Sequence, residues 1–182
     1  MLEASLLLEP GTKLMEILID SLLAARRPHG DQLLWQEKAA PLLIEPAPSV
    51  AHTARAIRVL ANVQAIRPAS QVQEALEQAV AWLIDQHDLH NAYEVIERPV
   101  DDGLEPVHIR HFTAALVVKA LVSAGIPAAH PSVSNAVAQI WKSYSDTAAL
   151  WAWDNGDLPI WMTLDAVEAL RLANLAVPAR PG

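Results

Sequence analysis

Two pairs of histidines have the spacing that a metal site on a helix would need. His87 and His90 are three residues apart, and so are His108 and His111. Residues at i and i+3 share one helix face, where two imidazole nitrogens can bind a transition metal. Asp102 is close to the second pair in the sequence, so His108, His111 and Asp102 are the candidate metal-ligating residues. The alternative, which we favour, is that these histidines cap helix ends or loops, and we expect neither a metal nor a cofactor.

Other side-chain patterns that catalysis requires are missing. Acidic residues cluster at 101–102 and 154–157, but Asp and Asn beside Gly are ordinary turn residues. The six glycines do not form a phosphate-binding loop. Cysteine is absent, which excludes disulfides, thiol nucleophiles and thiolate metal sites. These absences argue against an enzyme, and we assign no catalytic residue.

Composition limits the class of protein. The chain has 182 residues, of which 52% are hydrophobic and 19% charged, which predicts a single folded domain over 1–182. Its 13 Lys and Arg against 21 Asp and Glu give a net charge of −8, which disfavours nucleic-acid binding. The longest apolar stretch, 113–129, contains Lys119 and Pro127 and is too short to span a membrane. We therefore expect a soluble protein, and the absence of cysteine fits the cytoplasm.

The elements that would position these residues follow a repeated helical pattern. Apolar residues from Val72 to Leu83 have the spacing of an amphipathic helix. The same spacing of apolar residues occurs again 61 residues later. It also occurs 58 residues earlier, where one of the positions is polar. After each such helix come an aromatic residue (Trp35, Tyr93 or Trp153), a connection that contains proline, and a second apolar helix. The second helices are expected over 53–60, 114–121 and 163–170.

This order predicts an all-α fold of three tandem helical hairpins. The units extend over about 12–62, 70–126 and 131–177, and a tail follows at 178–182. A simpler alternative is three unrelated amphipathic helix pairs in one all-α domain. Agreement of the first helix, the aromatic residue and the second helix in the same order favours the repeat.

Three segments resemble the repeats of the α/α-toroid superfamily, namely Pro48–Leu60, Trp82–Tyr93 and Trp151–Thr163. This superfamily includes the terpenoid (squalene–hopene) cyclases, the protein prenyltransferase β-subunits and the thioester domains of complement-like proteins. The resemblance implies that the second helices line the inside of an arc and that the first helices form its outer layer. With three hairpins, the arc would be the open half of an α/α toroid.

The catalytic motifs of that superfamily are not present at the matching positions. Class II cyclases protonate their substrate with an aspartate that stands just before the threonine of a second helix. Here His52, Phe112 and Met162 precede the threonines. The fragment Ser145–Ala148 contains Asp-Thr-Ala but follows a first helix. The prenyltransferase zinc site and the thioester both need a cysteine, which the chain lacks.

A repeat without those catalytic residues predicts a non-catalytic interaction or scaffold module. Its apolar concave face would bind a protein partner, the rest of a parent protein or a second copy in a dimer, because three hairpins leave apolar surface uncovered. The alternative is a terpenoid cyclase-like or prenyltransferase-like enzyme, or part of one, that acts on an isoprenoid or another apolar small molecule. The residues expected to bind a partner or ligand are Thr53, Ile57, Val117, Leu121, Trp161, Thr163 and Leu164.

Overall fold

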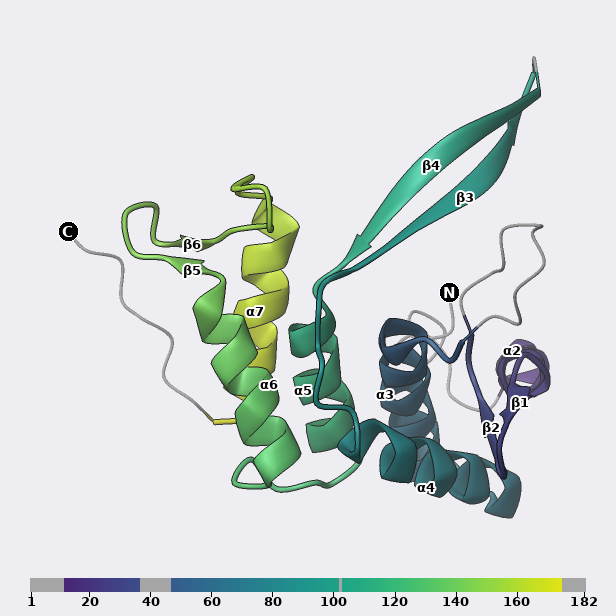
Figure 1. Ribbon diagram of the computed structural model, residues 1–182. Coiled ribbons are helices and arrows are strands. Elements are labelled where there is room, and N and C mark those ends of the chain that lie inside the picture. The colour runs from purple at the N-terminus through teal and green to yellow at the C-terminus, as the bar shows by residue number, and fades with distance from the viewer. Residues whose placement is uncertain (1–11, 37–46, 102, 175–182) are drawn as a thin grey trace.

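The computed structural model describes residues 12–36, 47–101 and 103–174 (Figure 1). The helices are α2 (Lys13–Ala24), α3 (Val50–Ile66), α4 (Ser70–Ile84), α5 (Thr113–Ser123), α6 (Pro131–Lys142) and α7 (Ile160–Leu172). The strands are β1 (Arg27–His29), β2 (Gln32–Leu34), β3 (Ala92–Val100), β4 (Gly103–His111), β5 (Tyr144–Ser145) and β6 (Leu150–Trp151). None of the helices within these ranges is long and apolar enough to cross a membrane.

Antiparallel β-hairpins join the helices in pairs, so the prediction of an all-α fold is wrong. Hairpin β1–β2 connects α2 to α3, β3–β4 connects α4 to α5, and β5–β6 connects α6 to α7. Of the described residues, 53% are helical and 19% lie in strands. This mixed architecture also overturns the α/α-toroid resemblance, which implied that loops join the helices. Of the three segments that suggested it, Pro48–Leu60 lies mostly in α3, whereas Trp82–Tyr93 and Trp151–Thr163 consist mostly of the connections between helix and strand.

The error has a physical cause in the connection between α4 and α5. Apolar and polar side chains alternate from Val107 to Arg110, which is the period of a strand. Pro99 and Pro106 seemed to break any regular element in this segment. Both strands of a two-stranded hairpin are edge strands, however, and an edge strand tolerates proline because half of its N–H groups need no partner.

Helix α5 lies at the centre of the helical body. It packs against α3, α4, α6 and α7, and every residue from Thr113 to Leu121 is buried. A helix that is covered on all sides needs apolar residues all round instead of one apolar stripe, and the sequence of this run is TAALVVKAL. Lys119 is the only charged residue in the run. Its partners on α7 are described with the cavity below.

A threonine near the start of each second helix ties that helix to the hairpin before it. Thr53 Oγ1 donates to the Trp35 carbonyl oxygen (3.3 Å). The other two hydroxyls accept from a backbone N–H: Thr113 Oγ1 from Ala92 (3.1 Å) and Thr163 Oγ1 from Trp151 (3.2 Å). The bonds to the Ala92 and Trp151 N–H groups give these donors an acceptor where strand and helix meet, and the Trp35 carbonyl oxygen accepts from the Ser49 N–H as well. The repeated threonine of the sequence therefore has a repeated structural role.

Two tryptophans fasten a hairpin to the end of the helix before it. Trp35 Nε1 donates to the carbonyl oxygen of Leu22 (2.9 Å), and Trp151 Nε1 donates to that of Ile140 (3.0 Å). The last carbonyl groups of a helix have no partner within the helix, so each indole caps one of them. Both rings are buried, so the same side chains also contribute to the core.

Hairpin β3–β4 projects away from the helical body as a long arm (Figure 1). Its register pairs Ala92 with His111 at the base and Val100 with Gly103 near the tip. Because side chains alternate between the two faces, one face carries Glu94, Ile96, Val107, Ile109 and His111, and the other carries Tyr93, Val95, His108 and Arg110. The second face is exposed, whereas the first becomes buried toward the base, at His111.

Candidate functional site

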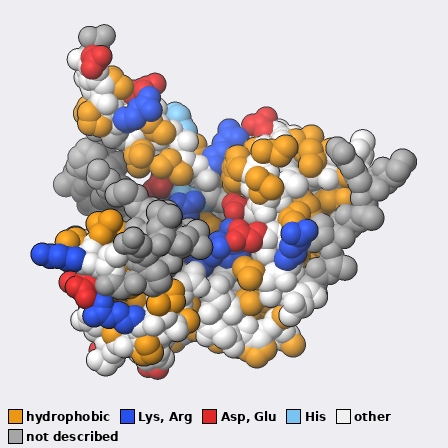
Figure 2. All heavy atoms as spheres, turned by 180° about the vertical axis from the view of Figure 1, so that it is seen from behind, with side chains coloured by type: hydrophobic (Ala, Val, Ile, Leu, Met, Phe, Trp, Pro, Cys, Tyr) orange, Lys and Arg blue, Asp and Glu red, His pale blue; other side chains and the backbone are white. Residues whose placement is uncertain are grey.

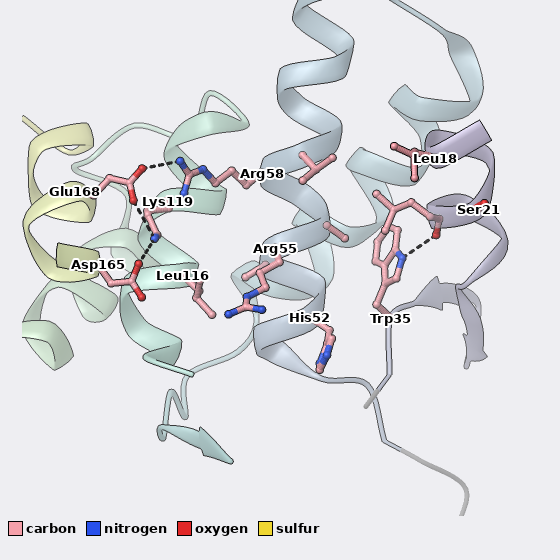
Figure 3. Close-up of a pocket in the computed structure, with 14 residues that line it drawn as sticks. Leu18, Ser21, Trp35, His52, Arg55, Arg58, Leu116, Lys119, Asp165 and Glu168 are labelled. Carbon is pink, nitrogen blue, oxygen red and sulfur yellow. Dashed lines mark hydrogen bonds and ion pairs between the residues drawn. The ribbon is translucent and has the colours of Figure 1, made fainter. Parts of the chain in front are cut away.

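Helices α2, α3, α5 and α7 line an open cavity of about 930 Å³ together with Trp35 (Figure 3). The lining residues are Leu18, Ser21, Leu22, Trp35, His52, Ala54, Arg55, Ala56, Arg58, Val59, Leu116, Lys119, Asp165 and Glu168. The space-filling view shows basic and acidic side chains gathered in a hollow between the two sides of the body (Figure 2). Three of the four helices that line the cavity, α3, α5 and α7, are second helices, but the cavity lining is not uniformly apolar.

The two ends of the cavity differ in character. Leu18 and Trp35 stand at one end, where the other side chains of the α2 wall are also small or apolar (Figure 3). Lys119 and Glu168 stand at the opposite end, and Arg55 lies between the two (Figure 3). A ligand that fills this space would meet apolar surface on one side and paired charges on the other.

The charged end is an ion-pair network across three helices. Lys119 Nζ on α5 lies 2.6 Å from Asp165 Oδ1 and 3.1 Å from Glu168 Oε2, both on α7. Arg58 on α3 lies 2.6 Å from Glu168 Oε1. The Lys119 side chain is only 4% exposed, and a buried ammonium requires such compensation. The network therefore lets α5 carry a buried cation and links α3 to α7 across it.

Glu168 is held in its ionised form by this network. Partial burial pushes the pKa of its carboxyl upward, but the hydrogen bond from Arg58 and the charge of Lys119 outweigh that effect. The pKa of Glu168 consequently lies below its usual value. At neutral pH this carboxylate keeps its charge, and together with Asp165 it balances the charges of Arg58 and Lys119.

Arg55 is the cation at the centre of the cavity. It precedes Arg58 by three residues on α3, so the two guanidinium groups belong to neighbouring turns of one helix face. Its side chain is exposed and makes no hydrogen bond or ion pair with another residue in the part of the chain that the structure describes. A guanidinium without a protein partner, in a cavity, can bind an anionic group of a ligand.

The structure separates the predicted metal candidates. His108 and His111 both lie in β4, and because their separation is an odd number of residues they face opposite sides of the strand. His108 is exposed, stacks on Tyr93 and is hydrogen-bonded to the Tyr93 hydroxyl. His111 is buried beside Glu94. Asp102 lies outside the described residues.

Four of the residues predicted to bind a partner or ligand lie in the core. These are Thr53, Ile57, Val117 and Leu121, each with an exposed fraction of 1% or less. They sit between the helices, whereas neighbouring positions on the same helices, such as Arg55 and Leu116, line the cavity. One residue along a helix turns the side chain by about 100°, so a small offset in the assumed face exchanges core for cavity.

The other three predicted residues lie on α7. Thr163 makes the threonine bond described above, and Trp161 packs against Trp153 with ring centroids 5.9 Å apart. Leu164 is 63% exposed and lines a shallow groove of about 500 Å³ together with Val167. The groove and the cavity share Glu168, but Leu164, Val167 and Arg171 line the groove alone.

The sequence interpretation missed the charged residues of the cavity. A signal for them was present, because Arg55 and Arg58 are three residues apart within one second helix, and so are Asp165 and Glu168 in another. Charges at i and i+3 form a single polar stripe on a helix. Opposite charges at corresponding places in two apolar helices indicate that the helices pair through them.

Comparisons with known proteins gave no match to any family model, any curated protein or any solved structure. The resemblance to terpenoid cyclases and protein prenyltransferases therefore has no support from relatives, and the fold contradicts it. Function has to be argued from the geometry of the cavity.

Proposed function

We propose that this chain is a non-catalytic binding module whose cavity takes an apolar group that carries a carboxylate or a similar anion. The observation that carries the proposal is the position of Arg55. Its side chain lies between the apolar and the charged ends of the cavity and has no ion-pair partner among the described residues. A guanidinium in this place offers two parallel N–H donors to an incoming carboxylate.

The charge of the lining supports an anionic ligand. The whole chain carries a net charge of −8, but the cavity is lined by three Lys or Arg and two Asp or Glu residues. The two acids are already bound to Lys119 and Arg58. The surplus charge is that of Arg55, in a protein whose surface otherwise repels anions.

The size and the apolar end of the cavity support a ligand with an apolar part. Pockets that bind small molecules measure about 300–1,000 Å³, and this cavity of about 930 Å³ lies within that range. Leu18, Leu22 and Trp35 provide apolar surface opposite the charged network. An apolar chain would cover this surface while its anion reached Arg55.

Two sources can supply this chemistry. One is a free carboxylic acid with an apolar chain, and the other is the C-terminal carboxylate of a partner protein whose last residues are apolar. Self-association remains a further form of partner binding, which light scattering over a range of concentrations would test. Because the chain has no cysteine, we place the module in the cytoplasm.

Calorimetric titration with decanoate tests the proposal. We expect decanoate to bind, and Arg55→Gln to weaken binding by about tenfold or more, since a hydrogen bond to a charged group contributes about 1.5–3 kcal/mol. Arg171→Gln is the matched control, because Arg171 lines the shallow groove and not the cavity. It should leave the affinity unchanged.

Two further ligands test which charge the cavity binds and whether the natural ligand is a free acid or a protein C-terminus. Decyltrimethylammonium has the same chain with the opposite charge and should not bind. The peptide acetyl-Leu-Leu-Leu with a free carboxylate should bind only if the natural ligand is a protein C-terminus, and its C-terminal amide should then fail. Equal binding of the cation and the anion, or equal losses in Arg55→Gln and Arg171→Gln, would contradict the proposal.

A further inference from the structure

Three side chains with metal-binding atoms meet at the base of the β3–β4 arm. They are His52 from the first turn of α3, Glu94 from β3 and His111 from β4. Glu94 Oε1 lies 2.9 Å from His111 Nε2 and 3.6 Å from His52 Nε2. One ligand atom from each residue lies within 4.8 Å of the other two. This triad, His52–Glu94–His111, differs from the metal candidates that the sequence suggested and shares only His111 with them.

The backbone explains why these residues converge. His111 is opposite Ala92 in the hairpin register, and Glu94 is two residues further along β3, so Glu94 and His111 project from the same face of the arm. That face turns toward the helical body at the base, where His111 is buried. The N-terminal end of α3 brings His52 to the same point, with ring centroids of the two histidines 5.5 Å apart.

The spacing fits a tetrahedral metal site. Zinc binds imidazole nitrogen and carboxylate oxygen at about 2.0–2.1 Å, so neighbouring ligand atoms in a tetrahedron are about 3.3 Å apart. The two measured separations, 2.9 and 3.6 Å, lie on either side of this value. Two imidazoles and one carboxylate are also the donor set of many three-ligand transition-metal sites.

The electrostatics of Glu94 favour a cation at this point. Its side chain is only 11% exposed, and it has no Lys or Arg partner in the part of the chain that the structure describes. A carboxylate so far removed from water needs a positive counterpart, and the side chains that face it are the two histidines. A divalent ion bound to neutral histidines would supply that charge, because metal ligation requires both rings to be deprotonated at the ligating nitrogen.

The two imidazole rings differ in the surroundings of the nitrogen that does not face Glu94. His52 Nδ1 lies 3.0 Å from Ser49 Oγ, a contact that orients the ring and leaves Nε2 toward Glu94. His111 is 1% exposed, and its Nδ1 is buried without a hydrogen-bond partner among the described residues. Ligation through Nε2 puts the proton of this ring on Nδ1, so the metal gives that N–H no partner.

We infer that His52, Glu94 and His111 bind a divalent transition-metal ion such as Zn²⁺. The ligand atoms are the two histidine Nε2 atoms and a carboxylate oxygen of Glu94. Three protein ligands leave a fourth position of a tetrahedral ion for water or a ligand. His52 is itself part of the cavity lining, so the proposed metal site borders the cavity. The metal site goes beyond the proposed function, because the cavity's interaction with an anion depends on Arg55 and requires no metal.

Metal titration of the full chain, purified without a histidine tag and treated with EDTA, tests the inference. We expect one equivalent of Zn²⁺ to bind in calorimetry and to raise the melting temperature, since a ligand that binds only the folded state stabilises it. Glu94→Gln and His52→Gln should each weaken Zn²⁺ binding by at least about tenfold, the loss seen even for residues that merely support a ligand. Co²⁺ should show the visible absorption bands of a tetrahedral site in the wild type and lose them in both variants.

The matched control is His108→Gln, on the same strand but the opposite face of the arm. It should bind Zn²⁺ as the wild type does. His111→Gln is a less secure test, because that ring is buried and its loss could unfold the chain. Absence of Zn²⁺ and Co²⁺ binding in the folded wild type would overturn the inference, as would equal losses in His108→Gln and Glu94→Gln. The decanoate titration is run on the metal-free chain, so failure of one proposal leaves the other standing.

Discussion

The hairpins β3–β4 and β5–β6 occupy the same place between paired helices but differ in how they are secured. The strands of β5–β6 have two residues each, and Trp151 on β6 is buried in contact with Trp141 and Tyr144. The strands of β3–β4 have nine residues each and leave the helical body after their first few pairs. The short hairpin is part of the core, whereas the long one is anchored at its base alone.

This difference shows how one kind of connection can serve two purposes. On β5–β6, Trp151 packs against Tyr144 of the paired strand and Trp141 of α6, so this hairpin contributes ring contacts to the core. The base of β3–β4 brings Glu94 and His111 beside His52, which lines the cavity, and the outer residues of the arm, such as Leu104, remain exposed. Stability should therefore depend on the short hairpin and on the base of the long one, and hardly at all on the tip of the arm.

The largest expected effect is at Trp151. Trp151→Ala removes a buried ring and its hydrogen bond to Ile140, and should lower the free energy of unfolding by about 3–5 kcal/mol. Tyr93→Ala, at an exposed position of β3, should change it by less than about 0.5 kcal/mol. Urea unfolding followed by circular dichroism measures both. Similar losses in the two variants would show that the hairpins are equally structural.

Removing the threonine hydroxyls that bond to the hairpin backbones tests whether β3–β4 and β5–β6 are anchored equally at their bases. Thr113→Val leaves the N–H of Ala92 without its acceptor, and Thr163→Val does the same to the N–H of Trp151. Each should cost about 1–2 kcal/mol in the same unfolding measurement, because a backbone donor loses its partner. Thr147→Val, at an exposed position between β5 and β6, is the control and should have no measurable effect. A loss confined to Thr163→Val would mean that the base of the long arm is not anchored in this way.

Shortening the arm should have a smaller effect. Replacing residues 97–106 by Asn-Gly brings the Ile96–Val107 pair next to a two-residue turn that suits a hairpin. The free energy of unfolding should change by less than about 1 kcal/mol, because the deleted part has little contact with the helical body. Zn²⁺ titration of the shortened chain should match the wild type, since Glu94 and His111 remain. Loss of folding would show instead that the tip stabilises the body.

The smallest effect concerns the contact between the two hairpin regions. Arg110 on β4 lies 3.1 Å from Asp157, in the loop after β6. The hydrogen bond from Asn155 and that from Arg110 together hold the pKa of Asp157 below its usual value. A lowered pKa means that the contribution to stability is present above the ordinary pKa of the carboxyl and is lost as the pH falls through the lowered one. In Arg110→Gln the pKa of Asp157, measured by NMR titration, should move upward, and an unchanged value would exclude the ion pair in solution.

Periodicity predicted the helices better than it predicted their connections. The expected second-helix segments lie within α3, α5 and α7, and each of these helices extends beyond its segment at both ends. Apolar residues at helical spacing report the buried face of a helix directly. The strands at 92–111 were missed because Pro99 and Pro106 suggested a loop, and a two-stranded arm with one buried end has only a short alternating run.

The sequence interpretation named one residue of the proposed metal site. His111 was named as a candidate ligand, but its neighbours were taken from the local sequence, whereas Glu94 and His52 come from the other strand and from an earlier helix. The position of His52 held a usable signal, because both His52 and His111 stand within two residues before the threonine of a second helix. Residues at equivalent places in a repeat lie at equivalent ends of neighbouring helices. The pairing of Lys119 with Asp165 could not be read from either helix alone.

The burial of α5 on all sides also determines how the chain can be made. When the ribosome has completed α5, the helices α6 and α7 that cover two of its sides have not yet been synthesised. Roughly fifty more residues must be added, which takes about 2–10 s at ordinary rates of translation. During that interval the apolar residues of α5 have only α3 and α4 to pack against. The nascent chain therefore passes through a state with an incompletely covered apolar helix, and such states are the ones most prone to aggregate.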